Sequence, residues 1–320
     1  MLAAVKKMNR AKIFRWLRRL ALSLLLLVVL LLFVVLPVGA SFLITNSRFR
    51  FPERGPKTAE EVGLPVMPVE FTTSDGIPLR GWWSPGNPSM PVIIFAHGLN
   101  RSRLELLERG AESNRRGYGV LLFDLRNHGE SGRAYTTIGI HESRDVCAAG
   151  KAVKEKSGNR PQILWGVSMG ASSAILGAKQ CPGFSAIVSD SAFLSFRETI
   201  AHHLRLFFGL PAFPIANLIV GVTSLRMGFD PADGDVEAAV RGIGIPILFI
   251  AGGRDRRMPP ALAERMLAAS RNPLKKLLLV PAAGHGDAFA TDRSVYLNSV
   301  FQFLENVRYN SVFSYKAGGS

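Results

Sequence analysis

A serine stands between two glycines in the stretch Gly166-Val167-Ser168-Met169-Gly170, directly after the apolar run 163–165. The pattern G-x-S-x-G is common by chance, so its position between an expected strand and an expected helix over 169–179 gives it weight. At such a turn the glycines let the backbone bend sharply, and the serine hydroxyl is exposed at the edge of a sheet. The N-terminus of the helix behind it favours negative charge. The sequence therefore predicts that Ser168 is a nucleophile.

A serine hydroxyl needs a base to take its proton, and His285 is the best candidate. It lies in Ala283-Gly284-His285-Gly286-Asp287, a flexible stretch just past the apolar run 277–280, at the sheet edge expected for Ser168. An ordinary solvated turn residue is the alternative interpretation. The other five histidines are expected to shape loops, to begin a helix or to line a substrate pocket: His97, His128, His141, His202 and His203.

A histidine base needs a carboxylate that fixes its tautomer and stabilises the imidazolium. Asp255 follows the apolar run 247–250 in a glycine-rich stretch and precedes His285, which gives the chain order Ser, Asp, His. A salt bridge with the neighbouring arginines is the alternative role for Asp255. Asp190, which follows the run 186–188, is the second candidate for the carboxylate.

The fourth requirement is a pair of backbone N–H groups that can stabilise a developing oxyanion. The segment His97-Gly98-Leu99-Asn100 directly follows the apolar run 92–96, and Leu99 can supply one N–H group. Met169, next to the expected nucleophile, can supply the other. A plain turn at the end of a strand is the alternative for 97–100.

Short apolar runs alternate with helical patterns along most of the chain. This alternation predicts a mainly parallel sheet covered by helices on both faces. An antiparallel hairpin around Asp75-Gly76 is expected to precede it. The expected strands are 69–72, 77–82, 92–96, 120–123, 163–165, 186–188, 247–250 and 277–280. The expected helices are 104–116, 142–156, 169–179, 260–269 and 293–307.

One long interval, 192–242, separates two expected strands without strand patterning. Long inserts in compact domains tend to be lids or binding elements, so we expect a helical lid over the active-site edge. Phe193, His202 and Phe207 are the candidates for substrate contact. The alternative is one more core helix with its loops.

The N-terminal part of the chain predicts a membrane anchor. Residues 1–19 carry seven Lys and Arg and no acid, and residues 20–45 carry no charge at all, which is long enough to span a bilayer. The positive-inside rule then places the N-terminus in the cytoplasm and the body of the protein outside. Cleavage of a signal peptide near Ala40 is the alternative, since 38–40 are small residues after an apolar run.

The remaining sequence divides into a linker, 46–66, a domain, 67–308, and a flexible tail, 309–320. Of the 39 Lys and Arg, seven lie in the N-terminal tail, which leaves a mildly basic body with 32 basic and 24 acidic residues. No basic run is interleaved with aromatic residues, so nucleic acid is not an expected partner. Cys147 and Cys181 are expected at opposite ends of neighbouring helices, too far apart for a disulfide.

The segment 69–307 resembles the α/β-hydrolase superfamily, and in particular its single-domain esterase, lipase and acyl-thioesterase-like members. Five landmarks occur in the family's order: the loop at His97, the stretch 123–132, the glycine–serine turn at Ser168, the stretch 245–255, and Gly284-His285-Gly286. The resemblance implies an eight-stranded sheet, a triad of Ser168, Asp255 and His285, and oxyanion donors at Leu99 and Met169. It also implies that 127–129 shapes a loop near the site without reacting. The insertion 192–242 matches no specific cap.

These residues predict acyl transfer in two steps, with an acyl-enzyme on Ser168 that water then hydrolyses. No metal or organic cofactor is expected. The apolar insertion and the membrane tether favour carboxylic ester or thioester substrates that are amphiphilic or lipid-like. Two alternatives remain open, an acyltransferase that uses the same triad and a catalytically silent, membrane-anchored scaffold.

Overall fold

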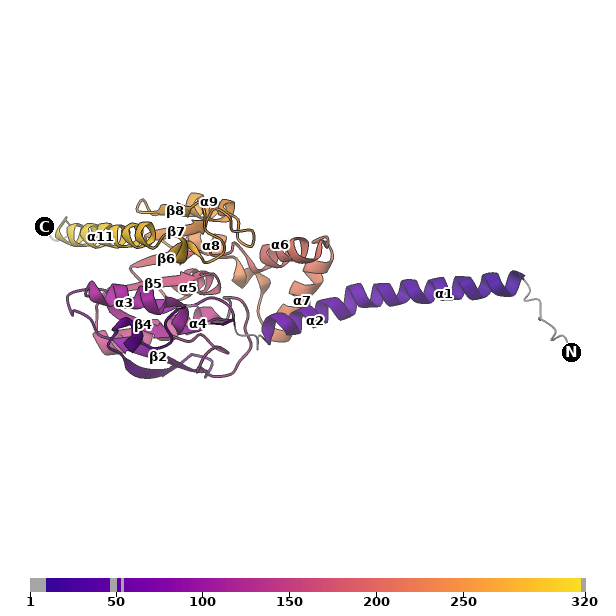
Figure 1. Ribbon diagram of the computed structural model, residues 1–320, viewed down its shortest axis with the longest axis horizontal. Helices are drawn as coiled ribbons and strands as arrows, with labels where there is room; N and C mark the ends of the chain where they lie inside the picture. Colours follow the sequence, from indigo (N-terminus) through magenta and orange to yellow (C-terminus); the bar gives the residue numbers. More distant parts are fainter. Residues whose placement is uncertain (1–9, 47–50, 53–54, 318–320) are drawn as a thin grey trace.

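A computed structural model describes residues 10–46, 51–52 and 55–317 of the chain (Figure 1). The first part of the expected basic tail, 1–9, lies outside the described residues. So do 47–50 and 53–54 of the expected linker, and 318–320 of the expected C-terminal tail.

Eight strands form one sheet in the order β1-β2-β4-β3-β5-β6-β7-β8. The first two pair antiparallel, β2 also pairs antiparallel with β4, and all other neighbours are parallel. Several strands are continuous runs of buried residues, as a parallel sheet covered on both faces requires. The prediction of a mostly parallel, eight-stranded sheet is confirmed. The strands are β1 (Met67–Thr72), β2 (Pro78–Ser84), β3 (Val92–Ala96), β4 (Gly119–Phe123), β5 (Gln162–Val167), β6 (Ala186–Asp190), β7 (Ile247–Gly252) and β8 (Lys276–Val280).

Helices cover both faces of this sheet. On one face, α4 (Glu142–Ser157), α5 (Met169–Gln180), α8 (Val236–Gly242) and α9 (Pro260–Ala269) contribute to one hydrophobic cluster. On the other, a second cluster includes α3 (Leu107–Arg115), with the 3₁₀ turn η3 (Arg103–Leu106) before it, α10 (Ala288–Thr291) and α11 (Arg293–Ala317). Neighbouring strand residues alternate between the clusters, since Ile94 belongs to the first and Ile93 and Phe95 to the second.

Cys147 and Cys181 form a disulfide, with their Cα atoms 5.8 Å apart, so the expectation that they lie too far apart is wrong. That expectation placed the two residues at opposite ends of neighbouring helices. Instead, the early turns of α4 meet the end of α5. At the contact a Cβ on Gly177 would lie only 2.9 Å from the Val146 side chain, so the absence of a side chain there lets the helices approach closely.

The insertion contains two helices that stand apart from the sheet, α6 (Phe196–Phe208) and α7 (Ile215–Met227). They build a third hydrophobic cluster around Phe196, Ile200 and Ile219. The short turn η4 (Pro231–Gly234) follows. The end of the insertion belongs to the body, because the buried face of α8 lies in the first cluster with α5 and α9.

The N-terminal segment is one long helical rod that projects from the body (Figure 1). It consists of α1 (Arg10–Leu30), a π-helical stretch η1 (Leu31–Val35) and α2 (Leu36–Thr45). Its 34 residues Lys12–Thr45 are long and apolar enough to cross a membrane, by length and composition. The rod does not stop short of the body, since Leu36, Ala40 and Ile44 pack against the cluster of α6 and α7.

Part of the expected linker also belongs to the body. The 3₁₀ turn η2 (Glu60–Val62) is flanked by Ala59 and Leu64, which are 2% and 4% exposed and lie in the second cluster. The segment between the rod and the sheet is therefore fixed to the protein at its C-terminal end.

Candidate active site

Ser168 lies at the sharp turn between β5 and α5 and has a positive φ of 53° with ψ of −115°. Such a backbone is rare for a residue with a side chain and marks a strained functional turn. The two flanking glycines make room for it. A Cβ on Gly166 would lie 2.3 Å from the carbonyl oxygen of Gly170, and one on Gly170 would lie 2.0 Å from that of Ala96.

A chain of hydrogen bonds joins Ser168, His285 and Asp255. Ser168 Oγ lies 2.8 Å from His285 Nε2, and His285 Nδ1 lies 2.7 Å from Asp255 Oδ2. The second carboxylate oxygen, Oδ1, accepts hydrogen bonds from the backbone N–H groups of Arg257 and Met258 at 2.9 and 2.8 Å. Asp255 is 3% exposed. The carboxylate is thus held in place on both sides, and the imidazole can take a proton from the serine hydroxyl.

Asp190, the second candidate carboxylate, makes different contacts. It is fully buried, and its oxygens accept hydrogen bonds from Ser191 Oγ and Tyr296 Oη at 2.9 and 3.0 Å. Burial raises the pKa of Asp190. Its link to the histidine loop is indirect, because Ser191 Oγ accepts a hydrogen bond from the Gly286 N–H at 3.3 Å. The structure therefore brings Asp255, and not Asp190, to the His285 ring.

The loop after β3 lies beside the serine. A Cβ on Gly98 would lie 3.6 Å from that of Ser168. The Gly98 N–H donates to Glu105 Oε2 at 2.6 Å, and the Asn100 N–H donates to His128 Nε2 at 3.1 Å. Leu99 lies between these two fixed points.

The two loop histidines have structural contacts. His97 Nε2 accepts a hydrogen bond from the Leu125 N–H at 3.0 Å, and His128 Nδ1 donates to the Arg126 carbonyl oxygen at 2.8 Å. Their rings meet edge to face, with centroids 5.1 Å apart. Both histidines therefore brace the loop that carries Leu99.

A cavity of about 480 Å³ opens at Ser168, which is within the usual size range of small-molecule sites. Leu99 and Met169, the two expected oxyanion donors, also line it. So do Phe193 and a mostly apolar set from α2, α6 and α7: Ala40, Leu43, Ile44, Thr199, Ile200, Leu204, Phe208 and Ile219.

Two of the three expected substrate contacts are placed elsewhere. His202 lines a neighbouring cavity of about 330 Å³, and its Nε2 donates to the Arg256 carbonyl oxygen at 2.8 Å. Phe207 is 58% exposed and packs on the ring of His203. In each case the next residue of α6 lines the cavity at Ser168: His203 instead of His202, and Phe208 instead of Phe207. Adjacent residues of α6 could not be distinguished before the orientation of this helix was known.

Three residues that line this mostly apolar cavity carry buried polar atoms without a partner. Among the described residues, the buried atoms Asn100 Oδ1, His203 Nε2 and Arg257 Nε have no hydrogen-bond partner, and all three residues line the cavity. Burial lowers the pKa of His203 to about 4 and also lowers the pKa of Arg257. Buried polar groups are normally paired, so these three atoms are exceptions among the residues of the cavity wall. Sequence reasoning missed Asn100 and Arg257 as candidate site residues.

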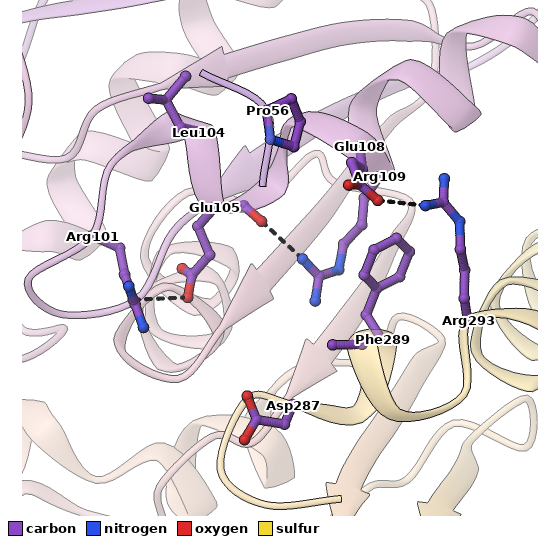
Figure 2. Close-up of a pocket in the computed structure, with 11 residues that line it drawn as sticks. Pro56, Arg101, Leu104, Glu105, Glu108, Arg109, Asp287, Phe289 and Arg293 are labelled. Carbon is purple, nitrogen blue, oxygen red and sulfur yellow. Dashed lines mark hydrogen bonds and ion pairs between the residues drawn. The ribbon is translucent and has the colours of Figure 1, made fainter. Parts of the chain in front are cut away.

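A second, polar pocket of about 370 Å³ lies next to the loop that carries His285 (Figure 2). Figure 2 shows Arg109 extended between the Glu105 carbonyl oxygen, 2.9 Å from Nη1, and the ring of Phe289. Arg293 pairs with Glu108 across the pocket. Glu105, which lines this pocket, also accepts a hydrogen bond from the Gly98 N–H. The pocket residues therefore help to position the loop beside Ser168.

Comparison with known proteins identifies the class. The chain belongs to the alpha/beta hydrolase family, whose model matches residues 93–296. It is 29% identical to the uncharacterized protein YqkD of Bacillus subtilis, over 72% of this chain and 77% of that protein. It is 30% identical to an uncharacterized protein of Mycobacterium tuberculosis, over 79% of this chain and 85% of that protein.

A solved structure agrees with this assignment. The Pyrococcus furiosus esterase Pf2001 superposes with a TM-score of 0.66 at 28% identity, over 80% of this chain and 98% of that one. The fold and these relatives support hydrolase activity for this chain.

Proposed function

We propose that the protein is a serine hydrolase that cleaves carboxylic ester or thioester bonds through an acyl-enzyme on Ser168. The observation that carries this proposal is the hydrogen-bonded chain from Ser168 to His285 to Asp255 at the wall of a mostly apolar cavity. Similarity to an esterase of Pyrococcus furiosus supports the same class of reaction.

The reaction has two halves. In the first, His285 Nε2 takes the proton of Ser168 as Oγ attacks the carbonyl carbon, and the same proton then passes to the leaving alcohol or thiol. In the second, His285 takes a proton from water, the resulting hydroxide attacks the acyl-enzyme, and the proton returns to Ser168 as the acid leaves. Asp255 stabilises the imidazolium in both halves. The backbone N–H groups of Leu99 and Met169 are the proposed donors to the oxyanion.

The substrate we propose is amphiphilic. Apolar side chains from α6 and α7, which act as the lid in this proposal, suit an acyl chain. The polar residues Asn100, His203 and Arg257, which line the same cavity, suit a polar group of the substrate. A guanidinium in a partly buried site favours a ligand with negative charge or good acceptors.

We also propose that the N-terminal rod anchors the protein in a membrane, with the N-terminus in the cytoplasm and the catalytic body outside. Lys12, Arg15, Arg18 and Arg19 precede the apolar stretch, which supports this orientation. The disulfide Cys147–Cys181 suits an oxidising compartment. Cleavage near Ala40 would cut the helix where Ala40 and Ile44 pack on α6 and α7, which favours an uncleaved anchor.

Hydrolysis of a series of p-nitrophenyl esters and thioesters tests the proposal. The full-length protein in detergent is compared with Ser168→Ala and with Ser224→Ala. Ser224 lies on α7, where its exposed hydroxyl donates to the Gly221 carbonyl oxygen. We expect free acid and alcohol or thiol from the wild type and from Ser224→Ala, and a loss of at least about 10⁴-fold in kcat for Ser168→Ala. Undiminished hydrolysis by Ser168→Ala would refute the proposal.

A further inference from the structure

The C-terminal end of the rod, which packs on the body, forms part of the active-site cavity. Ala40, Leu43 and Ile44 line the same cavity as Ser168. Their spacing of three and four residues places them on one face of α2. Leu43 is 68% exposed although it lines the cavity, so its side chain lies where the cavity meets the surroundings. The helix that leads to the proposed membrane span is thus also a wall of the site.

Polar contacts hold this wall in place. Arg226 of α7 donates to Ser41 Oγ at 2.6 Å, and its guanidinium lies 3.5 Å over the ring of Phe42. The Thr45 carbonyl oxygen accepts a hydrogen bond from the Thr136 N–H at 2.9 Å. Ser41 and Thr45 are fully buried. The position of α2 relative to the cavity is therefore fixed by the body and does not depend on a flexible tether.

The length of the rod determines where the cavity lies relative to the membrane. A bilayer core takes roughly 20 residues of helix. Counted from Leu20, the first residue after the last basic side chain of the tail, such a span ends near Gly39. Ala40–Thr45, with the cavity beside it, then lies at the surface of the membrane. Figure 1 shows α6 and α7 at the end of the body from which the rod leaves.

The two helices at this end and the loop between them expose large apolar side chains. Phe207, Phe208, Phe213 and Leu225 are 58%, 71%, 76% and 86% exposed. Exposed apolar groups of this size on one part of a protein mark a contact surface, and Phe and Leu side chains are typical of helix faces that insert into a membrane interface. Because Leu36, Ala40 and Ile44 of the rod pack against the cluster of α6 and α7, the bilayer from which the rod emerges is the partner that these exposed side chains fit. Phe208 also lines the cavity, so the two surfaces are continuous.

We propose that the acyl chain of the substrate passes directly from the bilayer to Ser168 along the wall formed by Ala40, Leu43 and Ile44. The natural substrate is then a long-chain acyl ester that resides in the same membrane as the enzyme. This proposal rests on the proposed serine hydrolase activity and membrane anchor. It assigns to the anchor helix a role in substrate selection, because its side chains contact the acyl chain.

Substitution of the wall tests substrate selection. Ile44→Trp narrows the cavity in full-length protein in detergent, and Val38→Trp is the matched control, since Val38 is an exposed residue of the same helix. We expect Ile44→Trp to lower kcat/KM for a hexadecanoyl ester at least about tenfold while a butanoyl ester changes little. Val38→Trp is expected to leave the ratio of the two substrates unchanged.

A second variant covers the case in which Ile44→Trp displaces α2. Leu43→Trp adds the same bulk at an exposed lining position and is expected to shift the ratio in the same direction. If butanoyl hydrolysis persists and neither variant alters the preference for chain length, the proposed wall is overturned while the hydrolase assignment stands. If the wild type hydrolyses neither ester, both proposals fail.

The route from the bilayer is tested with wild-type protein reconstituted into vesicles. A two-chain acyl ester that does not exchange between vesicles is placed either in the same vesicles as the enzyme or in separate, protein-free ones. We expect hydrolysis of this ester only in the shared vesicles, and equal hydrolysis of a soluble butanoyl ester in both arrangements. Equal rates for the two-chain ester would overturn direct transfer from the enzyme's own bilayer.

Discussion

The carboxylate of Asp255 lies 2.7 Å from Nδ1 of His285, whereas Asp190 reaches the same loop only through Ser191. Asp190 is the last residue of β6 and Asp255 lies just after β7, the neighbouring parallel strand, and both are buried. The geometry separates their roles, because only Asp255 can fix the tautomer of His285 and stabilise its protonated form.

Asn substitutions at the two aspartates distinguish these roles. Asp255→Asn is expected to lower kcat by about 10⁴-fold, because the amide favours the wrong imidazole tautomer. Asp190→Asn preserves the contact between His285 and Asp255, so we expect kcat to remain within about tenfold of the wild type. Ester hydrolysis measured on both variants checks this. A larger loss for Asp190→Asn than for Asp255→Asn would contradict the assignment.

The glycine that follows the nucleophile is expected to be indispensable for folding. Gly170→Ala would bring a Cβ to 2.0 Å from the Ala96 carbonyl oxygen, a backbone atom that cannot move without shifting β3. We therefore expect the free energy of unfolding to fall by more than about 4 kcal/mol. Gly221→Ala is the control, because nothing lies within 4 Å of its Cβ position inside α7. It is expected to raise stability by about 0.5–1 kcal/mol. Unfolding in detergent, followed by tryptophan fluorescence, compares them, and a stable Gly170→Ala protein would disprove the close approach.

The strands and the Ser168 turn could be predicted because their signals are local. Val92–Ala96 is a short apolar run bounded by turn residues, and a serine between Gly166 and Gly170 at the start of a helix is a pattern of a few adjacent residues. Asp255 and His285 could be predicted as partners from their positions just after apolar runs, and the resemblance to a known family implied the same triad.

Features that depend on how elements pack could not be predicted in this way. The distance between Cys147 and Cys181 depends on where α4 crosses α5, and the choice of His203 over His202 depends on the orientation of α6. The contact of Ile44 with the cavity joins parts of the chain that no local pattern relates. Each of these required the arrangement of the helices in space.

His203 gives a pH dependence of stability. Burial, helped by Arg257, His202 and His285 and opposed by Asp255, lowers its pKa to about 4 in the folded protein. The unfolded chain, with a histidine pKa of about 6.5, binds the proton more readily. The contribution of neutral His203 to the free energy of unfolding is therefore complete above about pH 6.5 and is lost progressively as the pH falls towards 4. Unfolding measured across this range should show a smaller decrease for His203→Gln. An identical decrease in the variant would contradict this origin.

The disulfide is expected to stabilise the contact between α4 and α5. It closes a loop with a sequence separation of 34, so the free energy of unfolding of the double variant Cys147→Ala/Cys181→Ala should be about 4 kcal/mol lower. Reductant should lower the unfolding midpoint of the wild type and leave that of the variant unchanged. Alkylation of both thiols in the unreduced, folded protein would show that the bond does not form.

The covalent reactivity of Ser168 is the central claim, and mapping a fluorophosphonate adduct tests it most directly. Full-length protein in detergent is labelled, digested and analysed by mass spectrometry, with Ser168→Ala and Ser224→Ala treated in parallel. We predict a single adduct on the peptide that contains Ser168 in the wild type and in Ser224→Ala, and none in Ser168→Ala. An adduct on a different residue, or none on a wild-type protein that hydrolyses esters, would contradict the account.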